Sequence, residues 1–201
     1  EQEMKEVLFS KGKELGIIDS EKGAEVSGAR FTYLKGDLVL LENALMQLAI
    51  KVLTSRETLK KIIEDAHLTV SDEPFIPVTP PLMMRSAVMN RMARLDPIDD
   101  RFYFDKDDLV LIGSAEHTLG PLHMDETLKE EKLPIRYFAL TPAFRREAGA
   151  AGKDTRGILR LHQFNKLEME SFSKPEDGLN EQNLMVAIQE YLMQQLKLPY
   201  R

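Results

Sequence analysis

The sequence lacks both cysteine and tryptophan among its 201 residues. Without cysteine the chain can form no disulfide, no thiolate zinc site and no cysteine nucleophile, so its fold must depend on a hydrophobic core. No apolar run approaches the ~18 residues of a transmembrane helix, and the first residues are acidic where a signal peptide would be basic. These absences predict a cytoplasmic protein without membrane association.

An excess of positive charge is also missing. The 27 Lys and Arg residues stand against 33 Asp and Glu residues, which gives a net charge of −6. This balance excludes a generic basic wrapper of nucleic acid, so any contact with nucleic acid must be local. With 43% hydrophobic residues the chain can bury one good core but is short for two. We therefore expect residues 1–201 to form a single domain.

Helical periodicity predicts helices toward both ends of the chain. The expected helices span residues 3–15, 37–66, 86–94 and 175–196. Gly16 follows the first of them, where a helix C-cap glycine belongs. Asp37 is expected to cap the second and longest helix.

Short runs of β-type residues occupy the middle of the sequence. The proline-rich segment 74–81 cannot be helical, and we expect an extended segment at a sheet edge or an interface. Residues 102–104 and 109–112 are expected to pair as a hairpin. Two further strands are expected in residues 135–140 and 158–172. Because regular βαβ alternation is absent, the fold class should be α+β with a mainly antiparallel sheet flanked by helices, and not a doubly wound nucleotide fold.

The chemically informative stretch runs from Phe144 to Glu168. From Arg145 onward it holds six basic and three acidic residues, so it favours an anion. If residues 160–168 form a strand, a period of two places these side chains on one face: Arg160, His162, Phe164, Lys166 and Glu168. On the preceding strand Arg145 and Glu147 would share a face. Such a hairpin offers guanidiniums for phosphate or carboxylate, a ring for a base, and carboxylates for an amino group.

A simpler interpretation stays open at this point, because charged residues on one face of a strand are usually just solvated. Phe164 departs from that pattern, since a lone aromatic among polar neighbours needs a partner. Residues 149–155 superficially suggest a phosphate-binding loop, but the glycine and lysine spacing of a Walker motif is absent. The four histidines show no metal-ligand spacing, so we expect no metal site within the chain.

Two short signatures carry a family resemblance. They are Phe144-Arg145-Arg146-Glu147 and Arg160-Leu161-His162-Gln163-Phe164. In these the chain resembles the class II aminoacyl-tRNA synthetases, whose second motif is an aromatic-Arg-x-Glu strand, a loop and an Arg-x-x-x-Phe strand. Residues 26–31, 34–36, 134–137, 152–157 and 198–201 narrow the resemblance to the seryl-tRNA synthetase family. The likeness covers nearly the whole chain and implies a partial class II catalytic fold.

The resemblance implies roles at the matching positions of the ATP site. Arg145 would hold the α-phosphate of ATP and the amino-acid carboxylate, and Arg160 would contact the nucleotide phosphates or orient the substrates. Glu147 would accept a hydrogen bond from the adenine amino group, and Phe164 would stack on adenine. Arg146 would belong to the same ATP-binding span through its backbone alone, because its side chain faces away.

The resemblance also implies a serine site and a dimer. Ser114, Ala115 and Glu116 are similar to the Thr-x-Glu tripeptide of the family, which together with Glu168 receives the ammonium and hydroxyl groups of serine. Pro81 matches the proline that ends the strand of the first class II motif, at a homodimer interface.

Two departures from the family pattern stand out. Residues 91–96 occupy the region where the family usually carries a Gly-Thr-Gly loop, so the role of that loop is open here. His117 follows the tripeptide where smaller apolar residues are common.

The implied function is that of a serine–tRNA ligase core, which uses ATP to activate L-serine as seryl-adenylate and transfers it to serine tRNA. No heptad array for a tRNA-binding coiled-coil arm and no third class II motif is seen in the sequence, so we expect an incomplete catalytic domain. The ligands for Mg²⁺ would then lie outside this span, and the isolated chain would be poorly active. The alternative is a synthetase-like paralogue that activates an amino acid for a carrier protein, or a binding or regulatory module.

Overall fold

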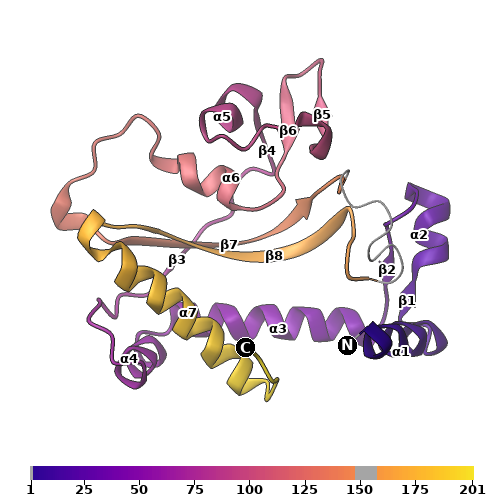
Figure 1. The fold of residues 1–201 in the computed structure, drawn as a ribbon, viewed down its shortest axis with the longest axis horizontal. Coiled ribbons are helices and arrows are strands. Elements are labelled where there is room, and N and C mark those ends of the chain that lie inside the picture. The colour runs from indigo at the N-terminus through magenta and orange to yellow at the C-terminus, as the bar shows by residue number, and fades with distance from the viewer. Residues whose placement is uncertain (1, 148–157) are drawn as a thin grey trace.

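A long antiparallel hairpin forms the centre of the computed structural model, which describes residues 2–147 and 158–201 (Figure 1). Strand β7 (Ile135–Phe144) pairs with β8 (Gln163–Phe172) in unbroken register, from Ile135 opposite Phe172 to Phe144 opposite Gln163. The short strand β3 (Ile76–Pro77) joins β7 on its other side in parallel. The proline-rich segment is therefore an edge strand, as its sequence predicts.

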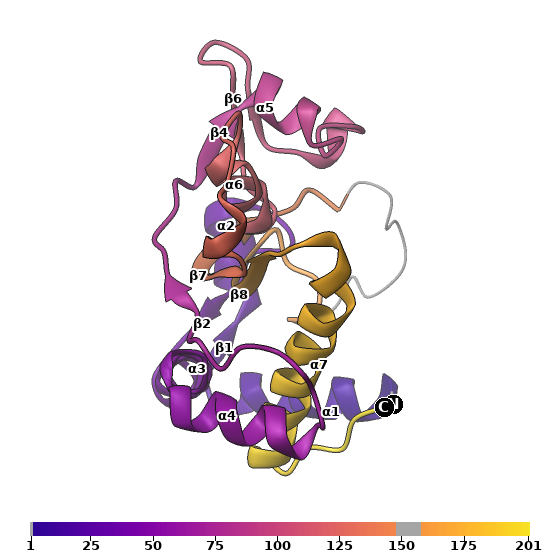
Figure 2. The ribbon, with the colours of Figure 1, turned by 90° about the vertical axis from the view of Figure 1, so that its left-hand side faces the viewer.

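The two faces of this hairpin pack against different layers (Figure 2). One face, called here the core face, packs on helices α4 (Arg56–Asp65) and α7 (Gly178–Gln195). The main core contains, among others, Leu53, Leu59, Ile62, Phe75, Phe138, Leu184 and Ile188. The opposite face, called here the site face, lies toward helix α6 (Glu116–Leu119) and a second small sheet. Alternation along each strand separates the two sets of side chains.

A buried ion pair fastens the core face to α7. The Nε and Nη2 atoms of Arg136 donate hydrogen bonds to Glu181 at 2.7 and 2.6 Å, and the two side chains are only 2% and 5% exposed. Nη1 donates to the backbone carbonyls of Ser71 and Glu73 at 2.8 and 2.9 Å. Burial favours a raised pKa for Glu181, but hydrogen bonds from Arg136 and Ser171 outweigh it, and the pKa lies below its ordinary value.

The second sheet has the strand order β4-β6-β5, with all pairs antiparallel. Its members are β4 (Met83–Arg85), β5 (Tyr103–Phe104) and β6 (Leu109–Leu111). The hairpin expected from residues 102–112 is confirmed, whereas β4 was not anticipated. Helix α5 (Ser86–Arg91) buries Met89 against Met84 and Val110. It ends three residues earlier than predicted, because Ala93 turns the chain with a positive φ of 54°.

The N-terminal region is more structured than its sequence suggests. Helix α1 (Gln2–Glu14) is confirmed, and Gly16 follows it with a φ of 69°, a conformation that favours glycine. Residues 18–34, for which neither a helix nor a strand is predicted, contain β1 (Ile18–Asp19), α2 (Ser20–Ser27) and β2 (Tyr33–Leu34). Asp19 caps α2 by accepting a hydrogen bond from the backbone of Lys22.

The prediction of one long helix over residues 37–66 is wrong. The structure has α3 (Asp37–Thr54) and α4, bent by 80° at Ser55. Ser55 is extended and accepts a hydrogen bond from the Thr58 backbone, so it caps a new helix that turns its apolar face into the core. The proposed cap at Asp37 is also wrong, since Gly36 holds the cap position. No single helix in the described residues has the length and hydropathy of a membrane span, although α3 and α4 reach them jointly across their bend.

The remaining helical elements are short turns of 3₁₀ helix. They are η1 (Ile98–Asp100), η2 (Gly120–His123), η3 (Glu130–Lys132) and η4 (Pro175–Asp177). The last of them leads into α7, which confirms the final predicted helix. The α+β class with a mainly antiparallel sheet is confirmed as well.

Candidate functional site

A cavity of about 520 Å³ opens where the end of the β7–β8 hairpin meets residues 94–117. Its lining consists of Arg94, Asp100, Arg101, Gly113, Ser114, Glu116, His117, Arg145, Glu147 and Arg160. The cavity thus unites two motifs that are far apart in the sequence, the 114–116 tripeptide and the hairpin end. Four of its residues are arginines and three are acidic, which suits a ligand that carries both charges.

Arg145 extends the hairpin by one residue beyond β7. Its backbone N–H donates to the carbonyl of His162 at 2.9 Å, and its Nε donates to the carbonyl of Gly113 at 2.9 Å. The guanidinium carbon lies 5.4 Å from the centre of the Phe164 ring. Phe164 therefore finds its partner in Arg145 on the site face, rather than in the core.

Glu147 and Arg160 approach each other on either side of the hairpin end. Arg160 Nη1 lies 3.3 Å from Glu147 Oε2, with side chains 39% and 20% exposed. The strand predicted over residues 158–172 is wrong at its start, because β8 begins at Gln163 and Arg160 precedes it. Strand alternation does not bring Glu147 to the side of Arg145 either, since β7 ends at Phe144 and Glu147 has a positive φ of 54°. Both side chains nevertheless line the same cavity as Arg145.

Arg146 stands apart from these three residues. Its guanidinium carbon lies 5.8 Å from the centre of the Phe102 ring, and its backbone N–H donates to the carbonyl of Asp100 at 3.3 Å. It is not among the residues that line the cavity. Its side chain therefore contacts Phe102 instead of the cavity, and its backbone contacts the cavity residue Asp100.

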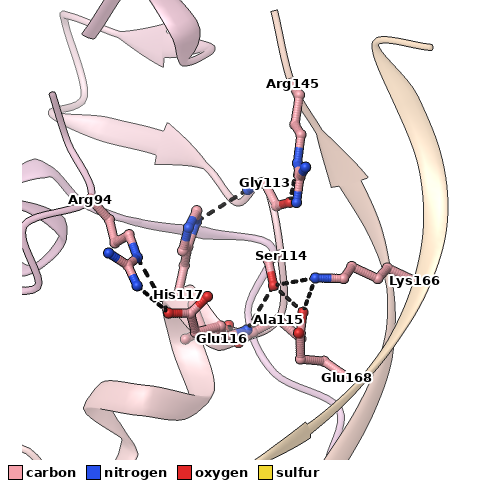
Figure 3. Close-up of polar contacts among 10 residues, drawn as sticks. Arg94, Gly113, Ser114, Ala115, Glu116, His117, Arg145, Lys166 and Glu168 are labelled. Carbon is pink, nitrogen blue, oxygen red and sulfur yellow. Dashed lines mark hydrogen bonds and ion pairs between the residues drawn. The ribbon is translucent and has the colours of Figure 1, made fainter. Parts of the chain in front are cut away.

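The other end of the site is a polar network between α6 and β8 (Figure 3). Lys166 Nζ lies 2.6 Å from Glu168 Oε2 and 3.2 Å from Ser114 Oγ. Ser114 Oγ donates to Glu168 and accepts from the backbone N–H of Glu116 at 3.3 Å. The register of β8 places Lys166 and Glu168 on the site face with Phe164, as the alternation predicts.

Ala115 and His117 hold this end in shape. Ala115 is fully buried against Leu119 and Ala139, so it serves packing. His117 Nδ1 accepts a hydrogen bond from the Gly113 backbone at 3.2 Å. Burial first, and then the charge of Arg101, lower the pKa of His117 to about 4, so the ring is neutral at neutral pH. A neutral ring is the form that can accept this bond.

Sequence reasoning gave no role to several residues that line the cavity. Arg94, Asp100 and Arg101 reach it from residues 92–101, and nothing in their local pattern indicates this. Glu170 continues the alternation of Glu168 along β8, a signal that could have been followed further. It is half-buried, and burial together with the charges of Glu116 and Glu168 raises its pKa to about 7.

Other predicted features lie outside the cavity. Within residues 2–147 and 158–201, no group of three or more His, Asp or Glu side chains is placed to hold a metal ion. Pro81 is exposed on the surface of the single chain, and its role at a dimer interface stays a prediction. Residues 149–155 and 152–157 lie entirely outside the residues that the structure describes.

Residues 101–201 match the family model described as tRNA synthetase class II core domain (G, H, P, S and T). Serine–tRNA ligase 1 of Streptomyces avermitilis is 41% identical over 191 residues, which is 94% of this chain and 41% of that protein. The serine–tRNA ligase of Sulfurisphaera tokodaii is 41% identical over 188 residues, 93% of this chain and 38% of that protein.

Solved structures of seryl-tRNA synthetases share the fold of this chain. Seryl-tRNA synthetase from Pyrococcus horikoshii, complexed with ATP, has a TM-score of 0.79 and 37% identity, covering 94% of this chain and 39% of its own. The cytoplasmic serine–tRNA ligase of Naegleria fowleri, in complex with AMP, has a TM-score of 0.73 and 30% identity, with 94% and 41% covered. The chain therefore spans about two fifths of the length of the relatives it matches.

Proposed function

The chain belongs to the tRNA synthetase class II core domain family (G, H, P, S and T), and we propose that it is the catalytic core of a serine–tRNA ligase. One observation carries this proposal: the 114–116 tripeptide and the hairpin end line one cavity. The identity of 41% to serine–tRNA ligases supports serine as the amino acid. The ATP and AMP complexes of two structural relatives support ATP as the nucleotide.

In the proposed first step, a carboxylate oxygen of serine attacks the α-phosphorus of ATP. The new bond joins serine to AMP, the bond from the α-phosphorus to the bridging oxygen breaks, and pyrophosphate leaves with the electron pair. Arg145 binds the α-phosphate and the serine carboxylate, and so screens the charge that builds up between them. Arg160 contacts the nucleotide phosphates. Because the chemistry depends on positioning and charge, it needs no protein nucleophile.

The adenine ring is proposed to lie at the hairpin end. Phe164 offers its ring for stacking, and Glu147 accepts a hydrogen bond from the exocyclic amino group. The ion pair of Glu147 with Arg160 is partly exposed, so a nucleotide can replace one side chain as the partner of the other at a modest cost in free energy.

Serine is proposed to lie at the opposite end, with its ammonium and hydroxyl groups at Ser114, Glu116 and Glu168. Lys166 already neutralises Glu168 there, and Ser114 bridges the two. The network is thus held in place before the substrate arrives, which limits the ordering cost of binding.

Several partners of the complete protein belong to the same proposal. The seryl group passes from the adenylate to serine tRNA, the protein works in the cytoplasm as a homodimer with Pro81 near the interface, and Mg²⁺ accompanies ATP. Mg²⁺ would supply further positive charge on the phosphates, and its ligands are assigned to no residue of this chain.

Two assays on the full-length protein test the function. Serine-dependent exchange of pyrophosphate into ATP reports the first step, with alanine and threonine as controls. Charging of serine tRNA reports the second. We expect both activities, with strong preference for serine. Exchange without charging would refute the ligase and favour the carrier-protein paralogue, and the absence of exchange would refute the proposed activation of serine.

A further inference from the structure

Residues 92–101 supply two arginines to the cavity, although this segment differs from the Gly-Thr-Gly pattern of the resembled family. Arg94 follows α5, and Arg101 precedes β5. Both line the cavity, and the proposed function gives neither a role.

Arg94 holds the carboxylate of Glu116 by a single oxygen (Figure 3). Its Nε and Nη2 atoms both donate to Glu116 Oε1, at 3.3 and 3.0 Å. Glu116 Oε2 has no hydrogen-bond partner within the described parts of the chain, residues 2–147 and 158–201. One oxygen is therefore fixed, and the other stays open on a residue that lines the cavity.

The backbone of Arg94 is itself anchored from two directions. Its N–H donates to the carbonyl of Met89 at 3.1 Å, which closes the end of α5. Its carbonyl accepts from Nε and Nη2 of Arg101 at 2.9 and 2.8 Å. The planar guanidinium thus extends from a fixed point, and its two donors are directed at one oxygen before any ligand binds.

We propose that Arg94 is a positioning residue that orients Glu116, so that Oε2 receives the α-ammonium group of the amino acid. This inference rests on the proposed function of the cavity as an amino-acid site. A glutamate side chain that is already ordered spares the ligand the cost of ordering it. That saving corresponds to a factor of about 3 to 10 in affinity at 25 °C.

A plain counterion would act in the opposite direction. If Arg94 merely competed with the ammonium group for Glu116, its removal would strengthen amino-acid binding. The two side chains are 49% and 36% exposed, so solvent screens their attraction and the orienting effect should dominate. The direction of the change in serine affinity therefore separates the two roles.

The test compares three variants of the full-length protein in serine-dependent pyrophosphate exchange. Arg94→Met removes both donors, and Arg94→Lys keeps the charge without the planar fork. Arg91→Met is the matched control, because Arg91 lies in α5 and binds Asp125 through two hydrogen bonds of 3.1 and 2.8 Å outside the cavity lining. Calorimetric titration with serine in the absence of ATP repeats the comparison without catalysis.

We expect Arg94→Met to raise the KM and the Kd for serine about 3- to 10-fold, with kcat and the KM for ATP within twofold of wild type. In Arg94→Lys the KM and the Kd for serine should also stay at least threefold above those of wild type. In Arg91→Met both values should match wild type. A serine KM that is unchanged or lower in Arg94→Met would overturn the role of Arg94. A wild-type protein that activates a different amino acid would instead refute serine as the substrate, and the same comparison with that amino acid would still decide the role of Arg94.

Discussion

The two faces of the β7–β8 hairpin carry ion pairs of opposite character. On the core face, Arg136 and Glu181 are 2% and 5% exposed, and two backbone carbonyls accept the hydrogen bonds from Nη1 of Arg136. On the site face, Lys166 and Glu168 are 32% and 20% exposed. A sealed pair cannot change partners without leaving a buried charge, whereas a partly open pair can exchange one partner for a ligand group. Burial therefore separates structural pairs from ligand-binding pairs more clearly than distance does, since both pairs are equally short.

The largest expected effect breaks the sealed pair. Glu181→Leu leaves Arg136 buried without its carboxylate and should lower the free energy of unfolding by about 3–5 kcal/mol. Urea denaturation measures it. The control is Lys22→Met, which removes an exposed pair with Glu25 and should cost less than about 0.5 kcal/mol. Equal losses in the two variants would contradict the distinction between sealed and open pairs.

The next effect concerns activity on the site face. Arg145→Ala in the full-length protein should lower serine-dependent pyrophosphate exchange by at least ~100-fold, because one charge-stabilising contact is lost. Lys at this position should restore little, since it lacks the planar fork. Arg56→Ala, which removes an arginine paired with Asp72 outside the cavity, is the control. Exchange within a few-fold of wild type in Arg145→Ala would rule out the hairpin end as the adenylate site.

A smaller effect is expected in amino-acid selectivity. A site that accepts a hydrogen bond from the hydroxyl of serine rejects alanine, because its acceptor would otherwise stay unpaired. Glu168→Gln should reduce the preference for serine over alanine by about tenfold or more, measured as a ratio of kcat/KM in the exchange assay. The control is Glu130→Gln, which removes an exposed carboxylate paired with Lys174. Unchanged discrimination would move the specificity role to another residue.

The smallest effect depends on pH and involves Glu170. Its pKa is about 7 in the folded chain, against an ordinary value of 4.5, and Glu116, Glu168 and Lys166 are the charges that act on it. Between pH 4.5 and 7 the carboxyl group of Glu170 is mainly protonated in the folded state and mainly ionised in the unfolded state. Its contribution to the free energy of unfolding is therefore fully present below pH 4.5 and is lost as the pH rises through 7. Glu170→Gln should remove this loss and raise the Tm relative to wild type by roughly 2 °C at pH 8 but not at pH 4.

His117 contributes in the opposite direction and is present in both proteins of that comparison. Its pKa is about 4 in the folded chain against 6.5 ordinarily, so its contribution grows as the pH rises across that interval. The contribution of His117 therefore cancels in the Tm difference between wild type and Glu170→Gln. A Tm difference that is independent of pH would contradict the raised pKa of Glu170.

Local patterns in the sequence account for much of this architecture. Period-two alternation along β8 placed Phe164, Lys166 and Glu168 on one face, and the register confirms it. The hairpin of residues 102–112 and the final helix followed from equally local signals. The bend at Ser55 is not predicted, because the apolar periodicity continues across it and a single capping serine is a weak signal. The packing of α4 in the main core determines where the helix bends.

Other parts of the site depend on contacts that no local pattern contains. Arg94 reaches Glu116 only because α5 stops where Ala93 adopts a positive φ. Glu147 comes to the cavity through a similar backbone turn, rather than through the strand alternation that predicted its position. The strands β1, β2 and β4 have two or three residues each, too few to show a period.

The alternation of β8 also makes this molecule suited to directed evolution. Positions 164, 166, 168 and 170 face the site, while Leu167 and Met169 pack against the main core. A combinatorial library restricted to these four positions would therefore sample new substrate preferences while the packing against the main core stays constant. A library at the odd positions would instead sample thermal tolerance. One ten-residue strand thus holds two nearly independent sets of adjustable positions, interleaved along the same stretch of gene.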